Sequence, residues 1–101
     1  VTSAQRTAAL PDTPTVAESG LPGFETTSWH GMVMPAKTPA AISGRVHAEM
    51  VKLLNLPDVK AGIEAQGNTV SPGTPEEFER FIAAEIAKWR KVIASAGIKI
   101  E

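Results

Sequence analysis

The stretch FETTSWHGMVM, residues 24–34, constrains the fold most because its side chains form two alternating sets. One set consists of Phe24, Thr26, Ser28, His30, Met32 and Met34, and the other of Glu25, Thr27, Trp29, Gly31 and Val33. A period of two with frequent β-branched and aromatic residues is typical of a β-strand. Pro35 follows, and its missing N–H ends a ladder. We therefore predict a strand that separates a loop-rich beginning from a largely helical remainder.

The composition limits the size and the class of the protein. With 101 residues, of which 43% are hydrophobic, the chain can bury at most one modest core. Ten basic and eleven acidic residues leave a net charge of -1 without a run of like charges, so no nucleic-acid or anionic-membrane surface is indicated. No apolar run approaches the ~20 residues that span a bilayer. Because the chain starts at Val1 without methionine, we expect it to be a piece of a longer protein.

Two helices are predicted directly after the strand. Thr38, followed by proline, supplies an N-cap and a first-turn proline for a helix over residues 39–54. A shorter helix is expected over residues 57–66, where Gly67 closes it. Residues 68–71 are a candidate short strand. These units are joined by short connections, as in compact α/β folds.

The strongest local signal predicts a third helix over residues 74–96. Thr74-Pro75-Glu76-Glu77 is a capping box with proline at the first helical position. Apolar residues then recur at steps of three and four, and we expect this side to bury Phe78, Phe81, Ile82, Ile86 and Trp89. Trp29 lies instead on the strand between small neighbours, where it could plug a hinge or line a cleft. We favour a buried plug.

The loop before the strand contains one predicted helical turn. Residues 16–20 can form it, with Thr15 as the cap, Glu18 as the capping-box partner and Gly20 as the stop. The whole loop over residues 11–23 is long for a small domain, and long ordered loops are often functional or packed against another element.

Nothing in the sequence indicates catalysis or metal binding. His30 and His47 are the only histidines, and the chain has no cysteine, so a metal-ligand spacing is missing. Ser28 precedes His30 by two residues, but no nucleophile-elbow pattern occurs. The glycines form no nucleotide-binding motif. We predict that the protein is not an enzyme and has neither a cofactor nor a metal site.

Ordered motifs along the whole chain resemble one protein family. ALPDTPTVAESGLPGF, residues 9–24, resembles the LPD-x-PT-x-x-E-x-G-x-PG-aromatic segment of the extracytoplasmic solute receptors of tripartite tricarboxylate transporters, the Bug or TctC-like receptors. The family's order continues with Ser28-Trp29-His30-Gly31, Pro35-Ala36, Thr38-Pro39, Gly73-Thr74-Pro75-Glu76-Glu77-Phe78 and Gly97-Ile98. The chain departs from the family at His30, Met34 and Lys37, where an aromatic, a small residue and glycine are usual.

The resemblance implies an α/β fold in which this chain is the C-terminal portion of a two-lobed, periplasmic binding protein-like Venus flytrap. Residues 1–23 would be the loop-rich tail of the second lobe, and residues 24–34 a crossing strand that acts as a hinge. Residues 35–101 would be a helical return to the first lobe. Ser28 and Trp29 are the hinge candidates.

The implied function is binding of a small carboxylate solute, such as a tricarboxylate or dicarboxylate, and its delivery to membrane permease subunits. Such a receptor would be periplasmic or extracytoplasmic. Ligands sit beyond the carboxyl ends of strands in open α/β sheets, so Thr2, Ser3, Thr13 and Thr15 are the candidate ligand-binding residues. For each hydroxyl, capping of a turn is an equally open interpretation.

Two alternatives concern the chain on its own. It could be a helical interaction module without ligand-binding activity, and as an isolated piece of a two-lobed receptor we expect it to bind carboxylates weakly or not at all. Exposed strand edges and apolar patches promote pairing with another chain. A further hypothesis is therefore a homodimer that pairs or exchanges residues 24–34 and shields Trp29.

Overall fold

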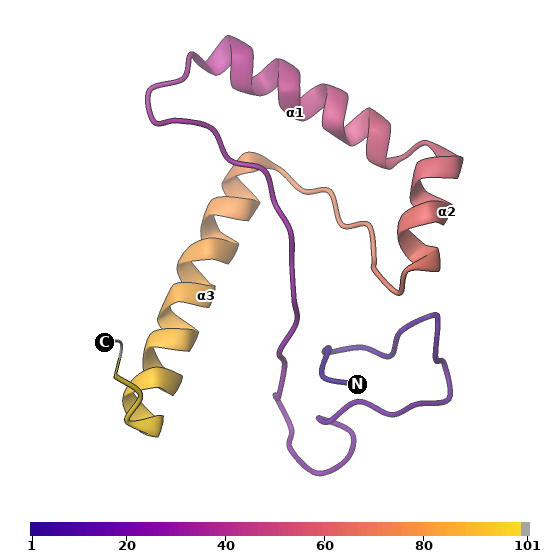
Figure 1. Cartoon of the computed structure of the whole chain (residues 1–101), viewed down its shortest axis with the longest axis vertical. Coiled ribbons are helices and arrows are strands. Elements are labelled where there is room, and N and C mark those ends of the chain that lie inside the picture. Colours follow the sequence, from indigo (N-terminus) through magenta and orange to yellow (C-terminus); the bar gives the residue numbers. More distant parts are fainter. Residues whose placement is uncertain (100–101) are drawn as a thin grey trace. The chain divides into compact units, whose positions relative to one another are not determined.

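The computed structural model describes residues 1–99 and contains three helices in that range, α1 (Ala40–Leu54), α2 (Pro57–Ala65) and α3 (Pro75–Ala96) (Figure 1). The chain forms two compact units. The first comprises Val1–Val70 and includes α1 and α2, and the second begins at Ser71 and includes α3. None of the helices in residues 1–99 has the length and apolar character needed to cross a membrane.

The start of α1 differs from the prediction by one residue, because Pro39 and not Thr38 is the N-cap. Pro39 has φ -54 and ψ 136, so its backbone is still extended, and no side chain caps the helix. The Thr38 hydroxyl donates to the Pro35 carbonyl at 2.7 Å. It closes the turn before the helix and makes no cap bond to the N–H groups of α1. After the break at residues 55–56, α2 begins at Pro57, as predicted.

Local chemistry at both ends explains why α3 is a single continuous helix, which confirms the prediction. At the N-terminus, the Thr74 hydroxyl oxygen accepts a hydrogen bond from the Glu77 N–H at 3.1 Å. Glu76 and Glu77 lie in the first turn, where the helix dipole favours acidic side chains. At the C-terminus, Gly97 takes the left-handed conformation with φ 66 and ends the helix.

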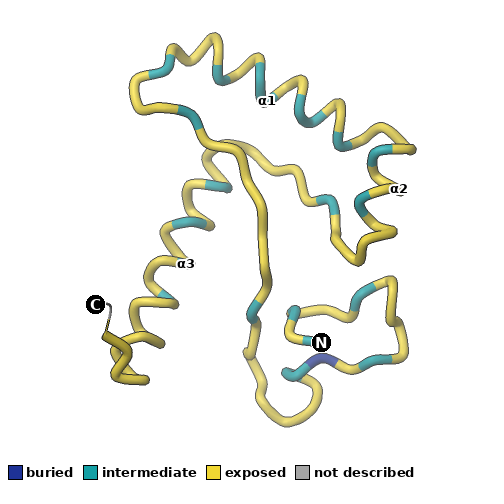
Figure 2. The backbone as a smooth tube through the Cα atoms, in the orientation of Figure 1, coloured by how far each residue is buried: buried dark blue, intermediate teal, exposed yellow. Residues whose placement is uncertain are grey.

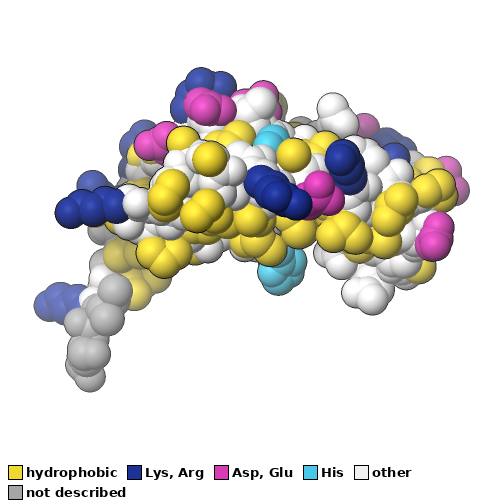
Figure 3. Space-filling model, turned by 90° about the horizontal axis from the view of Figure 1, so that it is seen from above, with side chains coloured by type: hydrophobic (Ala, Val, Ile, Leu, Met, Phe, Trp, Pro, Cys, Tyr) yellow, Lys and Arg dark blue, Asp and Glu magenta, His cyan; other side chains and the backbone are white. Residues whose placement is uncertain are grey.

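The predicted burial of the apolar side of α3 is wrong within its own unit. Phe81 is 38% exposed, Ile86 52% and Trp89 39%, and no residue of α3 is buried (Figure 2). A helix buries an apolar side only against a second layer, and α3 is the one helix described in this unit. Across residues 1–99 no hydrophobic side chain is fully buried, and yellow apolar side chains lie at the surface among charged ones (Figure 3).

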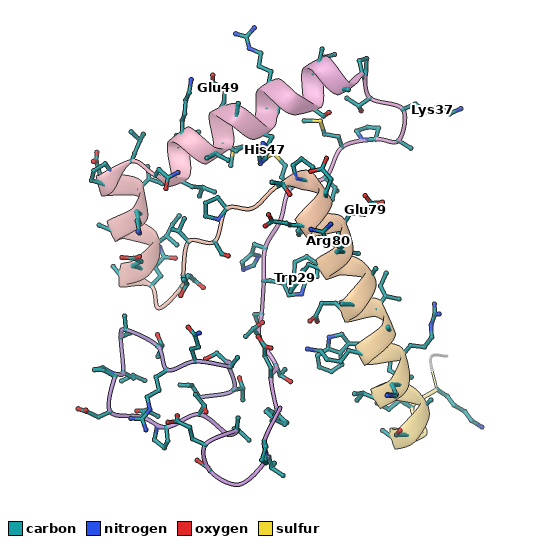
Figure 4. All side chains as sticks on the ribbon, turned by 180° about the vertical axis from the view of Figure 1, so that it is seen from behind. Trp29, Lys37, His47, Glu49, Glu79 and Arg80 are labelled. Atoms are coloured by element: carbon teal, nitrogen blue, oxygen red, sulfur yellow. The ribbon has the colours of Figure 1, made fainter. Side chains whose placement is uncertain are left out.

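The predicted strands are not formed within residues 1–99, although residues 24–35 have no helix or turn and run as extended chain before α1 (Figure 1). An extended segment becomes a strand only when its N–H and C=O groups pair with a neighbouring strand. The Thr26 N–H donates to the Thr2 carbonyl at 2.8 Å, but a continuous ladder does not follow. Residues 68–71 also lack strand pairing. Trp29 is 42% exposed on the extended segment (Figure 4), so the prediction of a buried plug is wrong.

Candidate functional site

Backbone hydrogen bonds bring the four candidate ligand-binding residues into one region of the first unit. The Val1 amino group donates to the Pro14 carbonyl at 2.8 Å, and the Val16 N–H donates to the Val1 carbonyl at 2.9 Å. Val1 is therefore bound to both neighbours of Thr15. Because Thr2 and Ser3 directly follow Val1, their segment lies beside the segment that carries Thr13 and Thr15.

Two of the four candidate hydroxyls are occupied by local hydrogen bonds. The Thr15 hydroxyl oxygen accepts from the Glu18 N–H at 3.1 Å, and the Thr15 N–H donates to Glu18 Oε2 at 2.8 Å. These reciprocal bonds are the predicted capping box, and Thr15 is only 2% exposed. The Ser3 hydroxyl donates to the Gln5 carbonyl at 2.7 Å, which is a local turn bond. Both residues therefore shape the loop.

The hydroxyls of the other two candidates, Thr2 and Thr13, make no hydrogen bond within residues 1–99. Thr2 is exposed and Thr13 is half-buried. A threonine hydroxyl can donate one hydrogen bond and accept two. The structure thus separates two hydroxyls that are bonded within the loop from two that make no hydrogen bond to the described residues.

An ion pair that the sequence did not reveal closes this loop. Arg6 Nε lies 3.0 Å from Glu18 Oε2 and Arg6 Nη2 lies 3.0 Å from Glu18 Oε1, which is a two-pronged contact across twelve residues. Arg6 Nη1 also donates to the Pro11 carbonyl at 3.2 Å. The only sequence signal was Glu18 as the partner of Thr15. No periodic pattern links Arg6 to it.

The same contacts shift the acidity of the pair. The hydrogen bond from Arg6 lowers the pKa of Glu18 from 4.5 to about 2, and the hydrogen bond from the Thr15 backbone adds to this effect. The hydrogen bond to Glu18 in turn raises the pKa of Arg6. Both groups are therefore charged at neutral pH, and the pair carries no net charge.

Surface hollows elsewhere do not involve the candidate residues. One open apolar hollow follows α1 and another follows the end of α3. The first is lined by Ala41, Ile42, Arg45, Val46, Glu49 and Met50, and the second by Lys88, Lys91, Val92, Ser95 and Ala96. Among residues 1–99 no three His, Cys, Asp or Glu side chains are grouped as metal ligands. The hinge candidates Ser28 and Trp29 are both exposed on the extended segment.

Comparisons with known proteins define the class and then the family. Over 96% of its length the chain superposes, with a TM-score of 0.81 and 35% identity, on the structure "R. palustris Rpa4515 with adipate". Residues 1–98 match the family model described as "Tripartite tricarboxylate transporter family receptor". The matched family is therefore one of transport receptors and not of enzymes. The chain belongs to the tripartite tricarboxylate transporter receptor family, which confirms the resemblance.

Two curated relatives agree with this family. The chain is 38% identical over 94 residues to the "UPF0065 protein in tcbD-tcbE intergenic region" of a Pseudomonas species, a match that covers 92% of the chain and 28% of that relative. It is 31% identical over 101 residues to "Protein BugT" of Bordetella pertussis, where the match covers the whole chain and 31% of the relative. The superposed R. palustris chain is covered to 32%. The chain thus spans about a third of the length of these proteins.

Proposed function

We propose that this chain is the part of a periplasmic or otherwise extracytoplasmic receptor that helps to bind a small carboxylate and present it to membrane permease subunits. The family match and the likeness to a structure solved with adipate support this proposal. The observation that carries it is the pair of unoccupied hydroxyls, Thr2 and Thr13, on a loop whose other hydroxyls are engaged.

In this proposal Thr2 and Thr13 donate hydrogen bonds to carboxylate oxygens. Hydrogen bonds to an ionised acceptor are about twice as strong as neutral ones, so hydroxyls suffice to hold a carboxylate without a free cation. Ser3 and Thr15 contribute to the site by fixing the loop. Residues 1–23 then belong to the second lobe, residues 24–34 with Ser28 and Trp29 serve as the hinge, and residues 35–101 return to the first lobe.

Calorimetric titration of adipate, succinate and citrate into the complete gene product that carries this sequence tests the proposal. We expect one of these carboxylates to bind. Thr13→Val, which keeps the shape and removes the hydroxyl, should weaken that affinity about tenfold, as expected for one hydrogen bond. Binding of no carboxylate by the complete product would contradict the proposed function. The isolated chain is the control that shows whether the binding cleft needs both lobes. We expect the isolated chain to bind carboxylates weakly or not at all.

The exposed apolar side of α3 favours a second candidate function, an interaction module without a ligand of its own. Phe81, Ile86 and Trp89 are more exposed than side chains in a packed core. In this second candidate the isolated chain associates as a homodimer through residues 24–34 and its helices. Sedimentation equilibrium of the isolated chain separates the two ideas, since a monomer mass at high concentration excludes the dimer.

A further inference from the structure

The Arg6–Glu18 contact does more than join two charges, because the Glu18 carboxylate has three partners. Glu18 Oε2 receives the Thr15 N–H at 2.8 Å and Arg6 Nε at 3.0 Å, while Oε1 receives Arg6 Nη2 at 3.0 Å. One carboxylate therefore ties the start of the loop to the capping box. A forked contact of this kind fixes the relative orientation of the two groups as well as their distance.

Thr13 lies inside this network although its hydroxyl takes no part in it. Two residues before Thr13, the Pro11 carbonyl accepts from Arg6 Nη1 at 3.2 Å. Two residues after it, the Thr15 N–H donates to Glu18. The chain is thus anchored on both sides of Thr13, and both anchors lead to the same Arg6–Glu18 pair.

The network also reaches the segment that carries Thr2. Pro14 and Val16, the neighbours of Thr15, are hydrogen-bonded to Val1 at 2.8 and 2.9 Å. Thr2 is the next residue, and its carbonyl accepts from the Thr26 N–H. A displacement of the capping box would therefore change the position of Thr13 relative to Thr2.

The exposure of the pair indicates what this contact contributes. The Arg6 and Glu18 side chains are 44% and 46% exposed, and exposed ion pairs add little to the stability of a fold. Two exposed charges that are joined by a forked contact, with a further hydrogen bond from the Thr15 N–H, are better suited to fix loop geometry than to stabilise the protein as a whole.

We propose that Arg6 and Glu18 are positioning residues that hold the Thr13 hydroxyl in register with the Thr2 hydroxyl for one carboxylate ligand. This inference rests on the proposed function. Loss of the Arg6–Glu18 pair should therefore lower the affinity for the ligand more than it lowers the stability of the fold. In this arrangement the pair acts on the ligand through Thr13, since Glu18 is directed to Arg6 and Thr15, and Arg6 is directed to Glu18 and Pro11.

The test measures the dissociation constant of the complete gene product for whichever of adipate, succinate and citrate binds most tightly. Arg6→Met removes the fork and should weaken binding about tenfold, the equivalent of one lost hydrogen bond. Arg6→Lys keeps the charge without the fork and should give a smaller loss. Glu49→Gln is the matched control, because the Glu49–Lys52 ion pair at 3.7 Å is also exposed and lies on α1. It should leave the affinity unchanged.

A double-mutant cycle distinguishes positioning from a general loss of stability. If Arg6 acts by placing Thr13, then Thr13→Val should weaken binding clearly in the wild-type background and much less in the Arg6→Met background. Additive effects, or wild-type affinity in Arg6→Met, would overturn the inference while leaving the proposed function intact. Failure of the wild-type protein to bind any of the three carboxylates would overturn both.

Thermal unfolding of the same variants completes the test. Arg6→Met and Glu49→Gln should have similar unfolding midpoints, since each removes one exposed ion pair. A much lower midpoint for Arg6→Met, with the affinity loss reversed on cooling, would mean that the pair serves stability alone and would contradict the inference.

Discussion

The loop over residues 1–26 and helix α3 reach order in opposite ways. The loop has no regular helix or strand, yet it contains the one fully buried residue among residues 1–99, Thr15. Its hydrogen bonds also cross up to 24 residues, from the Thr26 N–H to the Thr2 carbonyl. Helix α3 is regular over its entire length and capped at both ends, yet none of its side chains is buried. A segment of this protein can therefore form regular secondary structure without being buried, and a residue can be buried in a segment without regular structure. The first depends on neighbours in the sequence, and the second depends on contacts with distant segments.

The difference follows from where the hydrogen bonds lead. In an α-helix such as α3 the backbone bonds join residues about four apart, so the helix is specified by its own local sequence. In the loop the bonds join Arg6 to Glu18 and Val1 to Pro14 and Val16. These contacts require the segments to meet first, and they shield Thr15 once they have met.

The largest expected effect comes from breaking α3 from within. Ile86→Pro removes a backbone hydrogen bond and introduces a clash, which costs ~3 kcal/mol or more in a helix interior. Helical circular dichroism of the complete gene product should fall accordingly. Ile86→Ala is the control, because Ile86 is 52% exposed and alanine favours a helix. An undiminished helical signal in Ile86→Pro would contradict the helix.

The second prediction addresses the loop. Thr15→Val keeps the shape of the side chain but leaves the Glu18 N–H without its acceptor at 3.1 Å, and loss of such a cap costs ~1–2 kcal/mol. Amide hydrogen exchange at Glu18 and Ser19 should accelerate, while exchange within α3 stays as in the wild type. Equal acceleration in α3 would show that the two regions are not independently ordered.

A smaller effect is expected at the turn before α1, which carries Lys37 (Figure 4). Lys37 has φ 70, a left-handed conformation. This conformation is unfavourable for a residue with a Cβ, by roughly 1–2 kcal/mol, and is natural for glycine. Lys37→Gly should therefore raise the unfolding midpoint slightly, since the entropy that glycine adds to the unfolded chain offsets part of the gain. Lys37→Ala is the control and should give no increase. A lower midpoint for the glycine variant would contradict the assigned backbone.

The smallest expected effect is a pH dependence confined to the loop. Folding lowers the pKa of Glu18 to about 2 from 4.5, so its contribution to stability is complete above pH ~4.5 and is lost as the pH falls towards 2. Between pH 5 and 8 the Thr15 amide should show no change of chemical shift due to Glu18. Below pH ~3 it should shift as Glu18 takes up its proton, and Glu18→Gln should abolish that shift. A Glu18 titration centred near 4.5 would contradict the contact with Arg6.

These contrasts also explain how much could be predicted from the sequence. The bounds of α3, its Thr74 cap and the Thr15–Glu18 capping box depend on residues three or four apart, and all were predicted. The family could be identified because its motifs are short and ordered. The structure confirms these predictions because each one is local.

Apart from the local Thr38 cap of α1, the predictions that failed required distant partners. The alternation of side chains in residues 24–34 shows that this segment is suited to a β-strand. It becomes a strand only when its backbone pairs with a neighbouring strand. Likewise the apolar side of α3 is encoded locally, whereas its burial depends on a second layer. Arg6 and Glu18 are twelve residues apart in irregular chain, so no spacing rule could join them. The ligand-binding and hinge residues stay predictions.

The three partners of the Glu18 carboxylate also have an evolutionary consequence. Aspartate at position 18 is one methylene shorter and could not reach both the Arg6 guanidinium and the Thr15 N–H. Replacement of Arg6 alone would leave the carboxylate with one of its three donors, the Thr15 N–H. Substitutions at positions 6, 15 and 18 should therefore appear together or be absent among relatives, while outward-facing positions of α3 drift singly. Sequence variation among relatives would then show that these three loop positions change together.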